Sequence, residues 1–118
     1  MRKAEKSFRK AFYFNPDYIE AYILRGNIYL EQGQRFVEGL HDDFERYRKR
    51  AKESYLKVQS VANIDEETKG MAHYKLGETY YDFYGNKEKA SKQWKMAVSV
   101  SPESLWGKMA QERLNALK

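Results

Sequence analysis

The sequence predicts an all-α fold of about six helices, and three observations lead to it. Only two of the 118 residues are proline, so few positions interrupt a helix. Alanine, leucine, lysine and glutamate, which favour helices, are common. Apolar residues also recur at spacings of three and four, which places them on one helix face. The predicted helices span residues 2–14, 17–32, 36–62, 67–83, 87–100 and 103–117.

Composition limits the class of protein. The length suits one domain with a modest core. The formal net charge is +5, but 22 basic residues are mixed with 17 acidic ones. The absence of cysteine excludes disulfides and thiolate metal sites. No apolar run approaches the roughly 20 residues of a membrane span, and no apolar stretch follows the N-terminal Met-Arg-Lys. We therefore expect no signal peptide, which favours a cytoplasmic location.

One pattern occurs three times and defines what we call second-type helices. It consists of a small residue, an aromatic residue four positions later, and two small or apolar residues at further steps of three. A proline or an asparagine follows two positions later, where the helix is expected to end. The copies are Ala4, Phe8, Ala11, Phe14 and Pro16; Ala51, Tyr55, Val58, Val61 and Asn63; and Ala90, Trp94, Ala97, Val100 and Pro102.

A second pattern alternates with the first and defines first-type helices. Its two copies are Ala21, Gly26 and Tyr29, and Ala72, Gly77 and Tyr80, with identical spacing. A glycine inside a helix costs about 1 kcal/mol relative to alanine, so a recurring one predicts close helix–helix contact. Turn signals follow each copy, around Gly33 and Gly85.

The alternation of the two patterns resembles the tetratricopeptide repeat (TPR) family, whose signature is Leu-Gly and Tyr on one helix and Ala-aromatic-Ala-Pro on the next. The residues that match it best are Leu76, Gly77, Tyr80, Ala90, Trp94, Ala97 and Pro102, with one extra residue before Gly85. An earlier first-type helix matches through Gly26, Tyr29 and Gly33, although Arg25 stands where leucine is usual. The resemblance implies a short α-solenoid of antiparallel helix pairs.

In this scheme residues 1–118 form a single TPR-like domain. It consists of an unpaired second-type helix (2–14), an irregular repeat (17–62), a regular repeat (67–100) and a C-terminal capping helix (103–117). Because the chain opens on a second-type helix, we expect either a piece of a longer array or a helix that takes its partner from another molecule.

The irregular repeat contains an insertion at about residues 35–47. Gly26 and Gly77 are 51 positions apart, against a family period of 34. An apolar stripe nevertheless runs from Phe36 through Leu40 and Phe44 to Val58 at steps of three and four, which predicts one long helix. The apolar side of Phe36, Leu40 and Phe44 then needs a cover. Either the segment folds back as a separate short helix, or these residues form a self-association surface.

Catalytic and metal-binding chemistry is not indicated. His41, Asp42 and Asp43 are adjacent and therefore point to different helix faces, unlike metal ligands spaced at i, i+3 or i+4. His73 lies where a TPR packs a large ring. No nucleophile motif or glycine-rich phosphate loop occurs. We expect no enzyme activity, cofactor or metal.

The basic stretch Arg46–Lys52 invites a nucleic-acid hypothesis. On a helix its cations spread around the whole surface outside the apolar stripe, and acids are interleaved with them at i, i+4. A phosphate-tracking surface instead needs one sign of charge on one face, with accessible aromatic residues. The stretch is more typical of a solvated helix face, and nucleic-acid binding is the least favoured of three functions.

The favoured function is a non-catalytic adaptor that binds a peptide segment of another protein, since first-type helices of the TPR family line a concave groove. By the register of the resemblance, the groove residues are Glu20, Ile23, Asn27, Leu30, Met71, Tyr74, Glu78, Tyr81, Trp106, Met109 and Arg113. Their chemistry suits a segment with apolar, aromatic and basic side chains. The alternative is a homo-oligomeric assembly scaffold that uses the insertion and the N-terminal helix.

Overall fold

The computed structural model describes residues 2–14, 18–35 and 41–117, and these residues form helices and no strand. The all-α expectation is therefore confirmed for the described chain. The helices are α1 (Arg2–Phe14), α2 (Ile19–Arg35), α3 (His41–Ser60), α4 (Glu66–Tyr84), α5 (Lys87–Val100) and α6 (Leu105–Ala116).

Most described helix ends lie within two residues of expectation, and the region between α2 and α3 departs furthest. The described part of α3 begins at His41, and the expected start at Phe36 lies outside the described residues. The preceding helix, α2, continues through Gly33, where a turn was expected. At this helical position the ring of Phe83 from α4 packs where a side chain would stand. The glycine thus serves a helix contact and does not end the helix.

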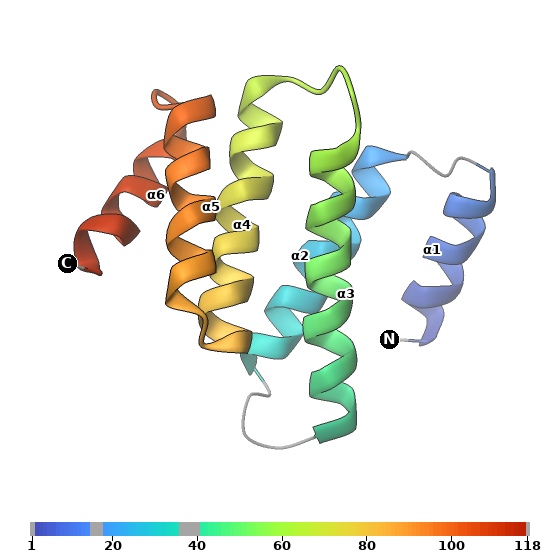
Figure 1. Ribbon diagram of the computed structural model, residues 1–118. Helices are drawn as coiled ribbons and strands as arrows, with labels where there is room; N and C mark the ends of the chain where they lie inside the picture. Colours follow the sequence, from blue (N-terminus) through green and yellow to red (C-terminus); the bar gives the residue numbers. More distant parts are fainter. Residues whose placement is uncertain (1, 15–17, 36–40, 118) are drawn as a thin grey trace.

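The helices pack in chain order and run in alternating directions (Figure 1). Each contacts the next, and α4 additionally contacts both α2 and α6. Within the described residues, the backbone of α1 approaches only α2, and α1 lies at the edge of the row opposite α6 (Figure 1).

Two apolar clusters hold the row together. One joins α2, α3 and α4 around Tyr29, Tyr55 and Leu76, and the other joins α4, α5 and α6 around Trp94. The predicted glycine contacts are confirmed, because a side chain at Gly26 would meet the ring of Tyr55, and one at Gly77 would meet the indole of Trp94. Each recurring glycine therefore receives the aromatic residue of a second-type helix.

Local signals end the helices where the chain must turn. Gly85 adopts a left-handed conformation with φ of 59°, and its N–H donates to the carbonyl of Tyr80. The side chain of Asn86 then accepts from the backbone N–H of Lys89 and caps α5. Asn63, which stands in place of proline in the second-type copy that starts at Ala51, also has a positive φ of 65° just beyond α3.

Candidate functional site

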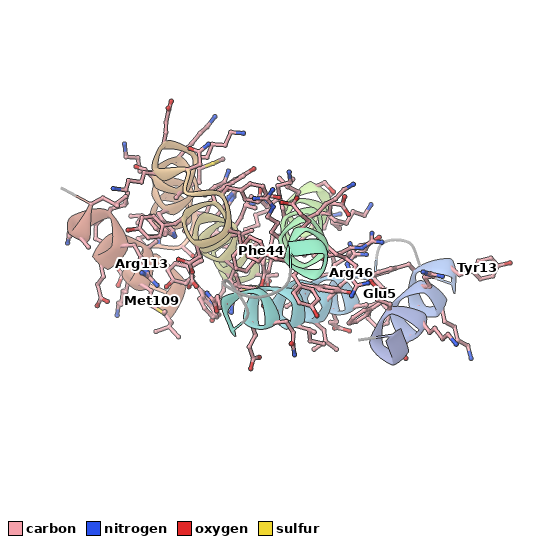
Figure 2. All side chains as sticks on the ribbon, turned by 90° about the horizontal axis from the view of Figure 1, so that it is seen from below. Glu5, Tyr13, Phe44, Arg46, Met109 and Arg113 are labelled. Carbon is pink, nitrogen blue, oxygen red and sulfur yellow. The ribbon has the colours of Figure 1, made fainter. Side chains whose placement is uncertain are left out.

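The first candidate site is the surface of α2, α4 and α6, which we call the α2–α4–α6 face. The backbone of α4 approaches those of both α2 and α6. The backbones of α3 and α5 do not approach each other within the described residues, and these helices are linked through the long side chains of Gln59 and Gln93, whose amide groups lie 3.2 Å apart. Seen along the helix axes, α2 lies on the lower side of α3, and Met109 of α6 lies on that same lower side (Figure 2).

The expected groove residues divide into accessible and interior ones. Leu30, Met71 and Tyr74 are only 4%, 8% and 2% exposed. These three side chains therefore lie in the interior and do not form an open surface, because they pack between neighbouring helices. Those with accessible surface are Glu20, Ile23, Asn27, Glu78, Tyr81, Trp106, Met109 and Arg113.

Two carboxylates lie at the centre of this face. Gln34 of α2 donates its side-chain amide to Glu78 at 3.3 Å and to Asp82 at 2.9 Å, both on α4. From the other side, a side-chain hydrogen bond with Tyr74 and the charges of Glu78 and Asp82 raise the pKa of Arg113 on α6. Residues of all three helices thus converge on one acidic pair.

Sequence reasoning missed Gln34 and Asp82. Gln34 directly follows Gly33, which was assigned to a turn. Asp82 follows Glu78 by four residues and therefore shares its helix face, a signal that was present in the sequence.

Aromatic surface lies beside the acidic pair. The ring of half-buried Tyr81 packs against Trp94, with 5.8 Å between centroids. The ring centroid of half-buried Trp106 lies 5.9 Å from that of Tyr74. The ammonium nitrogen of Lys75 lies over the Trp106 indole, 5.4 Å from its ring centroid. The buried rings of Trp94 and Tyr74 therefore fix the orientations of the half-buried Tyr81 and Trp106 rings.

Asn27 has less freedom than a groove residue would need. Its side-chain oxygen accepts a hydrogen bond of 2.6 Å from the hydroxyl of Tyr55, which is fully buried in α3. Its oxygen is already committed to holding α2 against α3.

The expected self-association surface is only partly described. Phe44 is half-buried and packs edge-on against Phe83 of α4, with 5.6 Å between ring centroids. Its ring therefore has a cover within the same chain. Phe36 and Leu40 lie outside the described residues.

Among the described residues, His73 is not part of a metal site. His73 is buried, and its Nδ1 lies 2.8 Å from the side-chain oxygen of Gln93, as suits a packed ring. The side chains of His41, Asp42 and Asp43 lie outside the described set. No group of three or more His, Cys, Asp or Glu residues converges elsewhere in the described chain. Nor is any described helix long and apolar enough to cross a membrane.

The side chains of the basic stretch Arg46–Lys52 point in different directions. Arg48 and Lys52 lie over the ring of Tyr84 at 4.7 and 5.0 Å, whereas Arg50 faces Glu5 of α1. Tyr84 comes from α4, so an aromatic residue of another helix lies next to these cations. Within the described residues, ion pairs at a spacing of three join Glu45 to Arg48 and Glu53 to Arg50.

Comparisons with known proteins find no protein-family model, curated protein or solved structure that matches this chain.

Proposed function

We propose that the chain is a non-catalytic protein-interaction module, a short α-solenoid of the TPR kind whose α2–α4–α6 face binds a peptide segment of a partner. The observation that carries this proposal is the asymmetric approach of the helices. The backbone of α4 approaches α2 and α6, whereas those of α3 and α5 stay apart. Unequal spacing on the two sides of a helix row curves it toward the closely spaced side, which gives a concave binding surface.

The chemistry of this face indicates its partner. Glu78 and Asp82 supply negative charge, and the accessible parts of Tyr81, Trp106 and Met109 supply apolar surface. A segment that combines lysine or arginine with a bulky apolar residue complements both features. An exposed ion pair contributes only about 0.2–1 kcal/mol, so the apolar contacts supply most of the affinity and the charges supply selectivity.

Pre-organisation favours binding at this face. Gln34 holds Glu78 and Asp82 from one side, and Tyr81 packs against the buried Trp94. Side chains that are already ordered lose little conformational entropy when a ligand binds. We therefore expect dissociation constants in the micromolar range, typical of peptide recognition on a small, fixed surface.

Selection from a phage-displayed library of random 12-residue peptides tests the proposal. We expect enrichment of peptides that combine aromatic or aliphatic residues with lysine or arginine. Asp82→Lys should then weaken binding of the selected peptides about three- to tenfold by fluorescence anisotropy, because it replaces a weak attraction with repulsion.

Glu88→Lys is the matched control, since it reverses another exposed carboxylate on α5, away from the face. It should change peptide affinity less than twofold. Equal losses for the two variants, with both melting cooperatively, would show that net charge and not this face governs binding.

A further inference from the structure

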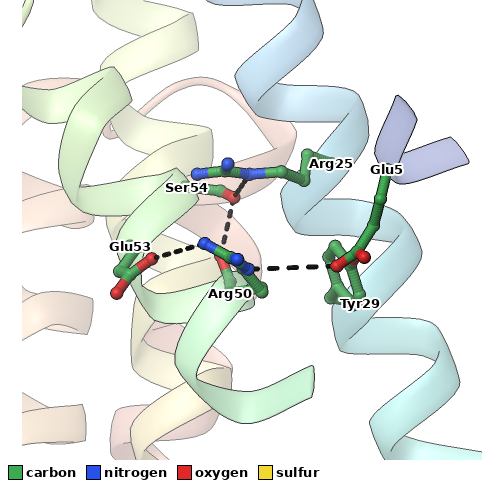
Figure 3. A network of polar contacts seen from close by, with 6 residues as sticks. All are labelled: Glu5, Arg25, Tyr29, Arg50, Glu53 and Ser54. Carbon is green, nitrogen blue, oxygen red and sulfur yellow. Dashed lines mark hydrogen bonds and ion pairs between the residues drawn. The ribbon is translucent and has the colours of Figure 1, made fainter. Parts of the chain in front are cut away.

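A second concave feature lies between α1, α2 and α3. It is a cavity of about 60 Å³ lined by Glu5, Phe8, Arg9, Phe12, Arg25, Tyr29 and Arg50. A second hollow on α3 adjoins it, since Arg50 borders both; its other residues are Glu45, Arg46, Lys49 and Glu53. The close-up in Figure 3 shows Arg25, Arg50 and Glu5 converging from three different helices.

Arg25 is held in one orientation at this cavity. Its Nε donates to the hydroxyl of Ser54 at 2.7 Å, and Ser54 in turn donates to the carbonyl of Arg50 at 2.6 Å. The guanidinium carbon lies 5.0 Å from the ring centroid of Phe12 and 5.2 Å from that of Tyr22. The plane of the guanidinium group is therefore fixed before any ligand arrives.

The outer nitrogens of Arg25 remain available. Within the described residues, Arg25 forms no ion pair with a carboxylate, and its hydrogen bond to Ser54 uses Nε. No fully buried side-chain nitrogen in the described chain lacks a partner, so the two Nη atoms are reachable from solvent. A guanidinium fork with free outer donors suits a bidentate oxyanion.

The cavity has more positive than negative charge, since three arginines and one glutamate line it. Arg50 lies 4.0 Å from Glu5 and 3.5 Å from Glu53, so these carboxylates are already engaged. Burial, followed by the nearby charge of Arg50, lowers the pKa of Arg25. Arg9 also lines the cavity and forms no ion pair in the described chain. An added anion would relieve this repulsion among like charges.

We propose that this cavity binds a phosphate-type oxyanion, held by the outer nitrogens of Arg25 together with Arg50 and with Arg9 at the mouth. Phosphate carries close to two negative charges at neutral pH and accepts bidentate hydrogen bonds from arginine. Stacked bases of a single-stranded nucleic acid suit the site less well, because Arg25 already covers the rings of Phe12 and Tyr22.

Glu5 gives the proposal its most selective test. Its carboxylate accepts a hydrogen bond of 2.6 Å from Tyr29 and shares the cavity with the arginines, so it opposes an incoming anion. Glu5→Gln keeps the acceptor for Tyr29 but removes the charge. Phosphate affinity should rise about three- to tenfold, as expected for removing one like charge at close range in a partly solvated site. A purely structural ion network would show no such gain.

Calorimetric titration of the folded chain with inorganic phosphate and with pyrophosphate, at constant ionic strength and pH 7.5, measures the site. We expect saturable 1:1 binding, with at least a tenfold loss of affinity for Arg25→Gln and for Arg50→Gln. Lys95→Gln removes an exposed cation of α5 as a matched control and should change affinity less than twofold. If Arg25→Gln does not fold, exposed Arg9→Gln should still lower affinity severalfold.

Absence of saturable binding by either anion overturns the proposal. Equal losses for Lys95→Gln and Arg50→Gln would also overturn it, because they would indicate general charge screening. A third arm uses a single-stranded deoxyoligonucleotide: binding that is tighter than pyrophosphate and insensitive to Arg25→Gln would assign the cations to nucleic acid and contradict a cavity site.

Discussion

The junction of α4 with α5 and the junction of α1 with α2 use similar sequence patterns but are built differently. At the first, Ala90 and Ala97 are fully buried, and the indole of Trp94 fills the place of the missing side chain at Gly77. At the second, the ring of Phe12 stacks on Tyr22, with 4.0 Å between centroids, and a cavity remains beside it.

The difference shows that one helix pattern supports two kinds of contact. Close packing leaves no room for a ligand, but it fixes the residues on the opposite side of α4, where the proposed peptide face lies. A contact made of rings, arginines and the carboxylate of Glu5 is held by directional polar interactions and leaves cationic groups accessible. The first junction therefore supports a binding face, and the second contains a candidate site itself.

The largest effect is expected at the packed junction. Gly77→Val places a branched side chain on the Trp94 indole, in a helix contact that cannot widen without moving α5. Overpacking of this kind costs about 1–3 kcal/mol or more, against a typical total stability of about 5–15 kcal/mol. Urea unfolding should show a clearly lower midpoint.

Gly85→Asn provides the control for that variant. Gly85 has a positive φ of 59° and no neighbour in the space a side chain would take, and asparagine tolerates this conformation. Its midpoint should stay close to that of the parent. A Gly77→Val protein as stable as Gly85→Asn would show that the two junctions do not differ in packing.

A smaller, local effect is expected at the α1–α2 junction. Phe12→Ala removes the ring that stacks on Tyr22 and lies beneath Arg25. We expect faster amide hydrogen exchange throughout α1 with little change in α4 and α5, because α1 contacts only α2 through its backbone in the described chain. Uniform acceleration across all helices would instead indicate that α1 belongs to the same cooperative unit.

The smallest effect is a dependence on acid pH. The hydrogen bond from Tyr29, assisted by the charges of Arg46 and Arg50, lowers the pKa of Glu5 below its usual 4.5. A lowered carboxyl pKa contributes stability above the unfolded value and loses it as the pH falls through the folded value. The protection factors of the α1 amides, which are corrected for the intrinsic pH dependence of exchange, should therefore fall as the pH drops below about 4.5, and those of α4 should fall later. In Glu5→Gln this acid step should be absent.

Much of the fold follows from the sequence because the repeated patterns specify pairs of residues that must meet. Gly26 with Tyr55 and Gly77 with Trp94 are each a missing side chain and a ring of fixed size. A glycine and an aromatic residue at fixed spacings in the sequence indicate such a contact without any knowledge of the distances between helices. Helix ends at Gly85 and before Pro102 were predictable for the same reason, since their backbone preferences are local.

The candidate sites were less predictable because they depend on how far apart the helices lie. Gln34 meets Asp82 only because α2 continues past Gly33 alongside α4. Tyr74 was expected on an open surface, but its neighbours on α5 and α6 close over it. The cavity under α1 depends on where the α1 backbone settles against α2. No spacing within a single helix contains that information.

The most direct test of the central claim is residue-resolved NMR of the folded chain titrated with a peptide from the proposed selection. If the α2–α4–α6 face binds peptides, the largest shift changes will fall on Gln34, Tyr81, Asp82, Met109 and Arg113. Signals from the outer surfaces of α3 and α5 should remain in place. Shift changes concentrated on α3 and α5, or spread evenly over the chain, would contradict the assignment of this face.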